Sequence, residues 1–174
     1  MDNMDNSKLN KMIIDAIEKS LEENFKEGEA ILLEALKDFP ENYLPYYNLG
    51  VIYIKSGQQD KAVPLLLKAE TLKPNDSDIY IETALAFQQC GEKEKAHEYY
   101  DKALACADEN AADSKHSRAV IYNNIGSLFF EKNDFLKAKE YYKKALSEEE
   151  YMLARENLLL VNTYIDIISS ESVR

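Results

Sequence analysis

The residue types that most often carry out catalysis or bind metals are scarce in this sequence of 174 residues. There are two histidines, His97 and His116, and two cysteines, Cys90 and Cys106, and none of them stands in a metal-ligand or catalytic motif. A glycine-rich phosphate loop, a Gly-x-Ser-x-Gly elbow and a His-Glu-x-x-His helix are absent from the sequence. We therefore expect no catalytic, cofactor-binding or metal site, and a protein that is not an enzyme.

Charge and composition restrict the partners further. The formal net charge is −11, and the densest basic spots, 115–118 and 143–144, are short and surrounded by acids. Such a chain is unsuited to nucleic acid or to an anionic membrane surface. The first six residues, Met-Asp-Asn-Met-Asp-Asn, form an acidic, largely polar segment with no apolar signal-peptide core behind it, and no run of 18 apolar residues occurs. We expect a cytoplasmic protein without a membrane span.

A pattern of 34 residues recurs along the chain and must position any binding residues. Two adjacent copies set the period, a third follows after an insertion, and a fainter copy precedes them. In all four copies, positions 8, 20 and 27 are Gly or Ala. Such small residues let two antiparallel helices, A and B, approach closely, with larger residues filling the space between. The copies occupy 9–42, 43–76, 77–110 and 119–152, and the small residues are Ala16, Gly28, Ala35, Gly50, Ala62, Ala69, Ala84, Ala96, Ala103, Gly126, Ala138 and Ala145.

This pattern resembles the tetratricopeptide repeat, most clearly in the copy at 43–76. The residues that carry the resemblance there are Tyr46, Leu49, Gly50, Tyr53, Gly57, Ala62, Leu66, Ala69 and Pro74. The resemblance implies an all-α fold, a right-handed superhelix (α-solenoid) of antiparallel helix pairs, as a single domain over 1–174. It also implies a non-enzymatic scaffold or adaptor for protein–protein interaction.

Two segments lie outside the repeats. The insertion at 111–118 equals about two helical turns, so it either lengthens the flanking helices or forms a longer surface loop. The resulting spacing of 42 residues is similar to that of kinesin light chains. Residues 153–174 are expected to form a capping helix, because a helical array needs its last apolar face covered. Leu160, Tyr164 and Ile167 make this helix apolar on more than one side, which favours the alternative of a homo-oligomer contact.

Stacked helix pairs curve, so the A helices line a concave groove. Positions 2, 5, 9 and 12 of each A helix form one stripe, and position 6 adds Asn48 and Asn124, whose amides could hydrogen-bond a peptide backbone. Leu44, Val51 and Leu85 have the alternative role of completing the packing between repeats. The predicted peptide-binding groove consists of Leu44, Tyr47, Asn48, Val51, Ile54, Ile81, Leu85, Gln88, Asn123, Asn124, Ser127 and Phe130.

The residues also bear on three more specific functions. Chaperone-binding repeats clamp a C-terminal carboxylate with Lys, Arg and Asn, and here the corresponding positions lack the cations. One frame has Tyr47, Val51, Glu82, Val120 and Asn124 at these positions, and the other has Ile13, Ile17, Asn48, Asp78 and Glu82. A self-assembling scaffold, or a small acidic chaperone similar to those of type III secretion, remains as an alternative to a peptide-binding adaptor.

Overall fold

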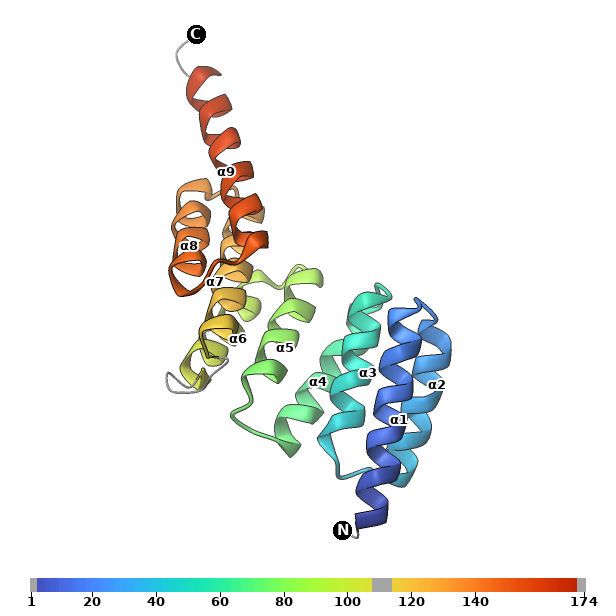
Figure 1. Cartoon of the computed structure of the whole chain (residues 1–174). Coiled ribbons are helices and arrows are strands. Elements are labelled where there is room, and N and C mark those ends of the chain that lie inside the picture. Colours follow the sequence, from blue (N-terminus) through green and yellow to red (C-terminus); the bar gives the residue numbers. More distant parts are fainter. Residues whose placement is uncertain (1–2, 108–113, 172–174) are drawn as a thin grey trace. The chain divides into compact units, whose positions relative to one another are not determined.

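The computed structural model describes residues 3–107 and 114–171. Over these residues the chain is all-α, with nine helices and no strand (Figure 1), which confirms the predicted fold class of paired helices. The helices are α1 (Asn3–Leu21), α2 (Phe25–Asp38), α3 (Tyr43–Lys55), α4 (Gln59–Leu72), α5 (Ser77–Gln89), α6 (Lys93–Cys106), α7 (Ser114–Glu131), α8 (Phe135–Glu148) and α9 (Met152–Glu171).

The chain divides into two compact units, Met1–Glu92 and Lys93–Arg174. In the first unit, α1 packs on α2 and α3 on α4, while α2 also contacts α3 and α4 contacts α5. In the second unit, α7 and α8 form a pair, α6 packs on α7, and α9 packs on both α8 and α7. The predicted repeat at 77–110 therefore gives α5 to the first unit and α6 to the second. A single domain over 1–174 stays a prediction.

The turn from helix A to helix B uses the same backbone conformation in all four copies. Gly57 and Gly91 have φ values of 74° and 80°, and Glu23 and Asn133, at the same repeat position, have φ values of 59°. This left-handed conformation is easy for glycine and acceptable for asparagine, whereas a glutamate there costs about 1 kcal/mol. Gly57 and Gly91 therefore form these turns without backbone strain.

The twelve small residues are all buried, as their predicted place between crossing helices requires. At Gly50, an added Cβ would lie 2.7 Å from Cγ of Leu66 on the paired helix. At Gly126, it would lie 2.7 Å from two ring carbons of Tyr142. Both distances are shorter than van der Waals contact, so helices α3 and α4, and α7 and α8, approach too closely for a larger residue.

The two segments outside the repeats are helical where the structure describes them. Helix α7 begins at Ser114, so residues 114–118 of the insertion lengthen this helix. Residues 111–113 lie outside the described residues. Helix α9 forms where a capping helix was predicted. Its Ala154 and Val161 are buried within the second unit, to which the helix belongs.

Candidate functional site

The predicted groove residues are distributed over both units. Leu44, Tyr47, Asn48, Val51, Ile54, Ile81, Leu85 and Gln88 belong to α3 and α5 of the first unit. Asn123, Asn124, Ser127 and Phe130 belong to α7 of the second unit. Each group is therefore described within its own unit, and the role of the twelve residues as one peptide groove stays a prediction.

In the first unit a depression of about 270 Å³ lies between α1 and α3; we name it the α1–α3 pocket. The structure here brings three predicted residues together with Ile17 and Ser20 of α1, which the sequence prediction missed. The hydroxyl oxygen of Ser20 is buried and has no hydrogen-bond partner, and the residue is only 8% exposed. A buried hydroxyl without a partner costs about 1–3 kcal/mol, which a ligand could recover. The pocket is lined by Ile17, Ser20, Leu32, Tyr47, Asn48, Val51, Ile52 and Lys55.

A smaller depression of about 160 Å³ lies between α3 and α5, where these helices begin. Tyr47 lines both depressions and so stands between them. Lys73 forms an ion pair with Asp76 (2.7 Å) and donates a hydrogen bond to the Tyr43 hydroxyl (2.9 Å). Asp76 is therefore neutralised, and it also caps α5 by accepting from the Asp78 and Ile79 amides. The lining residues are Tyr43, Leu44, Tyr47, Lys73, Asp76, Asp78 and Ile79.

Two carboxylates on α5, Asp78 and Glu82, give the surface formed by α1, α3 and α5 its negative charge. Burial raises the pKa of the Glu82 carboxyl; Lys55 opposes the rise and Asp78 adds to it. Burial, followed by the charge of Asp76, also raises the pKa of Asp78, while Lys73 lowers it. The pKa of the Tyr47 phenol is raised by burial, then by Glu82 and Asp78. The face is thus acidic at α5, and Tyr47 stays a neutral phenol near neutral pH.

The other predicted residues of the first unit offer less surface. Ile54 is 7% exposed and belongs to the core, so it is not on the open face. Leu44 and Leu85 are half-buried against the core, as expected if they complete the packing between repeats. Ile81 and Gln88 are also half-buried. The Asn48 side chain donates an N–H to the Leu44 carbonyl (2.8 Å), so its second N–H and its oxygen are the atoms that could meet a ligand.

In the second unit, helix α9 contacts two of the four predicted residues. Asn123 is 2% exposed, and its Oδ1 accepts a hydrogen bond from Asn157 of α9 (2.9 Å). The Phe130 ring meets Tyr164 of α9 edge-to-face, with 5.1 Å between ring centroids. Asn124 and Ser127 are half-buried. Asn123 therefore serves the packing of α9 and has no exposed surface to offer a peptide.

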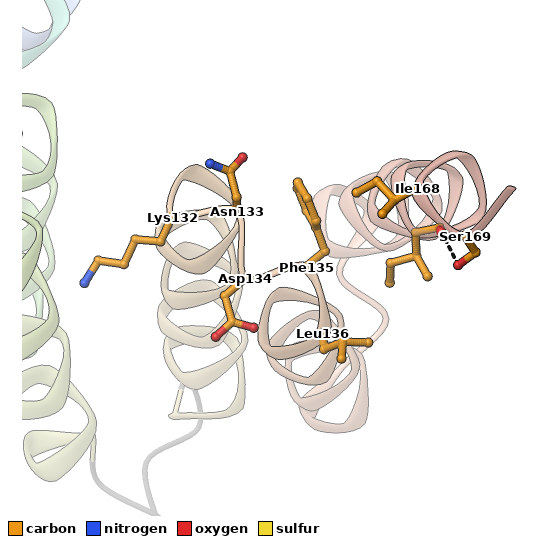
Figure 2. A pocket seen from close by; sticks show the side chains of 8 residues that line it. Lys132, Asn133, Asp134, Phe135, Leu136, Ile168 and Ser169 are labelled. Carbon is orange, nitrogen blue, oxygen red and sulfur yellow. Dashed lines mark hydrogen bonds between the residues drawn. The ribbon is translucent and has the colours of Figure 1, made fainter. Parts of the chain in front are cut away.

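A depression of about 460 Å³ in the second unit was not predicted from the sequence (Figure 2). Two of its polar side chains are engaged elsewhere: Lys132 points away from it and pairs with Glu94 (3.1 Å), and Ser169 donates to the Ile165 carbonyl (2.8 Å). Leu136, on the first turn of α8, is 73% exposed and gives this depression an apolar edge. The lining residues are Lys132, Asn133, Asp134, Phe135, Leu136, Ile165, Ile168 and Ser169.

The candidate chemical residues have ordinary surroundings. Neither Cys90 nor Cys106 is in a disulfide, and both are half-buried. His97 packs edge-to-face on Phe129, and the His116 ring nitrogen lies 2.5 Å from a Glu149 carboxylate oxygen. Among the described residues, no group of three or more His, Cys, Asp or Glu could hold a metal ion, and none of the described helices could span a membrane.

Paired helices with methyl-sized residues at their crossings define a helical-repeat protein of the interaction-scaffold type. Two sequence models described as tetratricopeptide repeat match the chain, one at residues 77–147 and the other at 31–63. The chain belongs to the tetratricopeptide-repeat family, as its residues predicted. Such repeats are protein–protein interaction modules.

Several known proteins are similar over part of their length. Anaphase-promoting complex subunit 3 of Schizosaccharomyces pombe is 25% identical over 104 residues, covering 60% of this chain and 16% of the relative. Type IV pilus assembly protein PilF of Pseudomonas aeruginosa is 31% identical over 111 residues, covering 64% of this chain and 40% of the relative. The chain thus spans less than half the length of either relative.

Solved structures support the fold. BtubC (BKLC) from P. vanneervenii superposes with a TM-score of 0.76 at 22% identity, covering 91% of this chain and 73% of that one. The apo form of the quorum sensor NprR from B. thuringiensis superposes with a TM-score of 0.75 at 21% identity, covering 93% of this chain and 50% of that one. At these identities the likeness shows the fold alone.

Proposed function

We propose that the chain is a non-enzymatic scaffold that binds a peptide or protein segment on the face formed by α1, α3 and α5 of the first unit. The observation that carries this proposal is the α1–α3 pocket, where apolar side chains surround a buried hydroxyl without a partner. Monomeric proteins seldom leave such a combination open without a ligand to fill it.

The pocket suits one apolar side chain of a partner. Ile17, Val51 and Leu32 supply the apolar walls, and burial of a Val- or Leu-sized side chain there contributes about 1.5–3 kcal/mol. The Ser20 hydroxyl and the remaining Asn48 amide atoms can bond a peptide backbone whatever its side chains are. The Tyr47 ring gives a flat, rigid contact with little loss of conformational freedom on binding.

Selection of a displayed library of random peptides on the intact chain tests this function. Enriched peptides are titrated against the unchanged chain and against Val51→Asp, which places a charge in the apolar pocket. We expect affinity to fall by about tenfold or more, because an unpaired carboxylate would be desolvated on binding. Circular dichroism and the unfolding temperature of the variant establish that it is folded.

Leu136→Asp is the matched control, since it makes the same kind of change in the depression of the second unit. This variant should leave the affinity unchanged. If no peptide is enriched, or if Leu136→Asp abolishes binding while Val51→Asp does not, the face of the first unit is not the binding site.

A second candidate is self-association through α9, as predicted for a homo-oligomer. It is supported by large apolar residues that remain exposed on this helix: Met152 73%, Leu153 46%, Leu159 71%, Leu160 47%, Tyr164 43%, Ile167 49% and Ile168 45%. Light scattering of the intact chain over a hundredfold range of concentration tests it. We expect a dimer or larger species, and we expect Leu159→Lys to convert it to the monomer. A chain that is strictly monomeric at every concentration would exclude this candidate.

A further inference from the structure

Three rows of side chains run across α1, α3 and α5, because residues 34 apart occupy equivalent places in the repeat. In two of the rows the character changes from apolar on α1 to polar or charged on α3 and α5, whereas the middle row is apolar throughout. The rows are Ile14, Asn48 and Glu82; Ile17, Val51 and Leu85; and Leu21, Lys55 and Gln89.

The α1 edge of this face is an exposed apolar stripe. Ile14, Ile17 and Leu21 are 54%, 43% and 72% exposed, and their spacing places them on one side of the helix. Ile17 also lines the α1–α3 pocket, so the stripe continues into it. The buried, unpartnered Ser20 hydroxyl lines the same pocket. This edge thus offers apolar contact area together with one hydrogen-bonding group.

The α5 edge carries two carboxylates, Asp78 and Glu82, that are four residues apart and lie on the same side of the helix. Neither forms an ion pair with another described side chain, whereas the neighbouring Asp76 is paired with Lys73. Burial raises the pKa of both carboxyls; the charge of Asp76 adds to the rise at Asp78 and that of Asp78 to the rise at Glu82, while Lys73 and Lys55 oppose them. A cation brought by a partner would relieve the repulsion between these charges and gain two charge-assisted contacts.

We propose that this face recognises an extended segment that places an apolar side chain at the α1 edge and a lysine or arginine at the α5 edge. This inference rests on the proposed function and adds to it the chemical class of the partner. Glu82 is then a specificity-determining residue: it discriminates against acidic segments and favours basic ones.

The geometry of three neighbouring helices sets the spacing within the partner. Packed helices lie about 8–10 Å apart, so α1 and α5 are separated by about 16–20 Å. An extended chain covers this span in about five or six residues, at roughly 3.3–3.6 Å per residue. A helical segment would need about twelve residues for the same span, at 1.5 Å per residue. The expected motif is therefore an apolar residue and a basic residue about five or six positions apart.

The motif is tested by sequencing the peptides that a displayed random library yields on the intact chain and on Glu82→Gln. On the unchanged chain, enriched sequences should pair Leu, Ile or Phe with Lys or Arg at the expected spacing. Glu82→Gln should bind these peptides about fivefold or more weakly and should lose the preference for basic residues. Glu34→Gln, an exposed site on α2, is the control and should bind like the unchanged chain.

The outcomes separate this inference from the function on which it rests. If enriched peptides depend on Val51 but show no basic preference and bind Glu82→Gln equally well, the inference is overturned and the proposed function stands. If binding is insensitive to Val51→Asp, or if no peptide is enriched, the proposed function fails and the inference fails with it.

Discussion

Helices α3 and α7 occupy the same place in their repeats, yet their fifth and sixth positions have different surroundings. In the first unit these positions are Tyr47 and Asn48, and both line the α1–α3 pocket. In the second unit they are Asn123 and Asn124, and Asn123 is buried and bonded to Asn157 of α9. The position within a repeat therefore does not by itself assign a binding role.

The neighbouring helix makes the difference. Next to α3 lies α5, which brings carboxylates that keep their charge unpaired and leave room for a ligand. Next to α7 lies α9, which brings an amide for Asn123 and an aromatic ring for Phe130. We therefore regard the surface around Tyr47 and Asn48 in the first unit as the one that awaits a partner, whereas the equivalent Asn123 of the second unit is already bonded within the chain.

The largest expected effect that tests this difference is on stability. Asn123→Ala leaves the half-buried Asn157 amide without its acceptor and opens a gap at a buried position, so it should lower the unfolding free energy of the second unit by about 1–3 kcal/mol. Asn48→Ala removes only a bond to its own helix and replaces Asn by a better helix former, so its cost should be below about 0.5 kcal/mol. Hydrogen exchange followed by mass spectrometry measures the two units separately.

A double substitution provides the control for this prediction. When Asn123 and Asn157 are both replaced by leucine, neither amide is left without the other, and stability should return toward that of the unchanged chain. Equal costs for Asn123→Ala and Asn48→Ala would contradict the proposed contrast between the two units.

The sequence predicted the helix pairs because their cause is local and repeated. Small residues at Gly50 and Gly126, and the left-handed turn at Gly57 and Gly91, leave the backbone few alternatives. Residue types at fixed spacing are enough to identify such features.

Binding surfaces were harder to predict because they depend on which helix lies alongside. Asn123 is an ordinary surface candidate until the contacts of α9 are known, and α9 does not follow the repeat pattern. Ile17 and Ser20 belong to the faint first copy, where most repeat residues are replaced. Applying the stripe of positions 2, 5, 9 and 12 to this copy does identify them, since they stand at its positions 9 and 12.

The smallest expected effect concerns position 6 itself, which is Glu82 on α5 and Asn124 on α7. Because the pKa of Glu82 is raised in the folded chain, the folded state holds more protons than the unfolded state between the two pKa values. The contribution of Glu82 to the free energy of unfolding therefore falls as pH rises through this window. At neutral pH the ionised carboxylate destabilises the fold to its full extent. Of the groups that face it, Asp78 adds to the penalty and Lys55 reduces it.

Glu82→Gln removes this charge and should stabilise the first unit by about 0.5 kcal/mol at pH 7, while weakening binding of basic peptides. The gain should shrink as pH is lowered through the ordinary pKa of glutamate, below which the carboxyl of the unchanged chain is protonated in both states. Denaturant unfolding at several pH values measures it, with exposed Glu34→Gln on α2 as the matched control. A variant less stable than the unchanged chain at pH 7 would mean that the Glu82 carboxylate already has a stabilising partner within the fold, and the two units would then not differ in the way their contacts indicate.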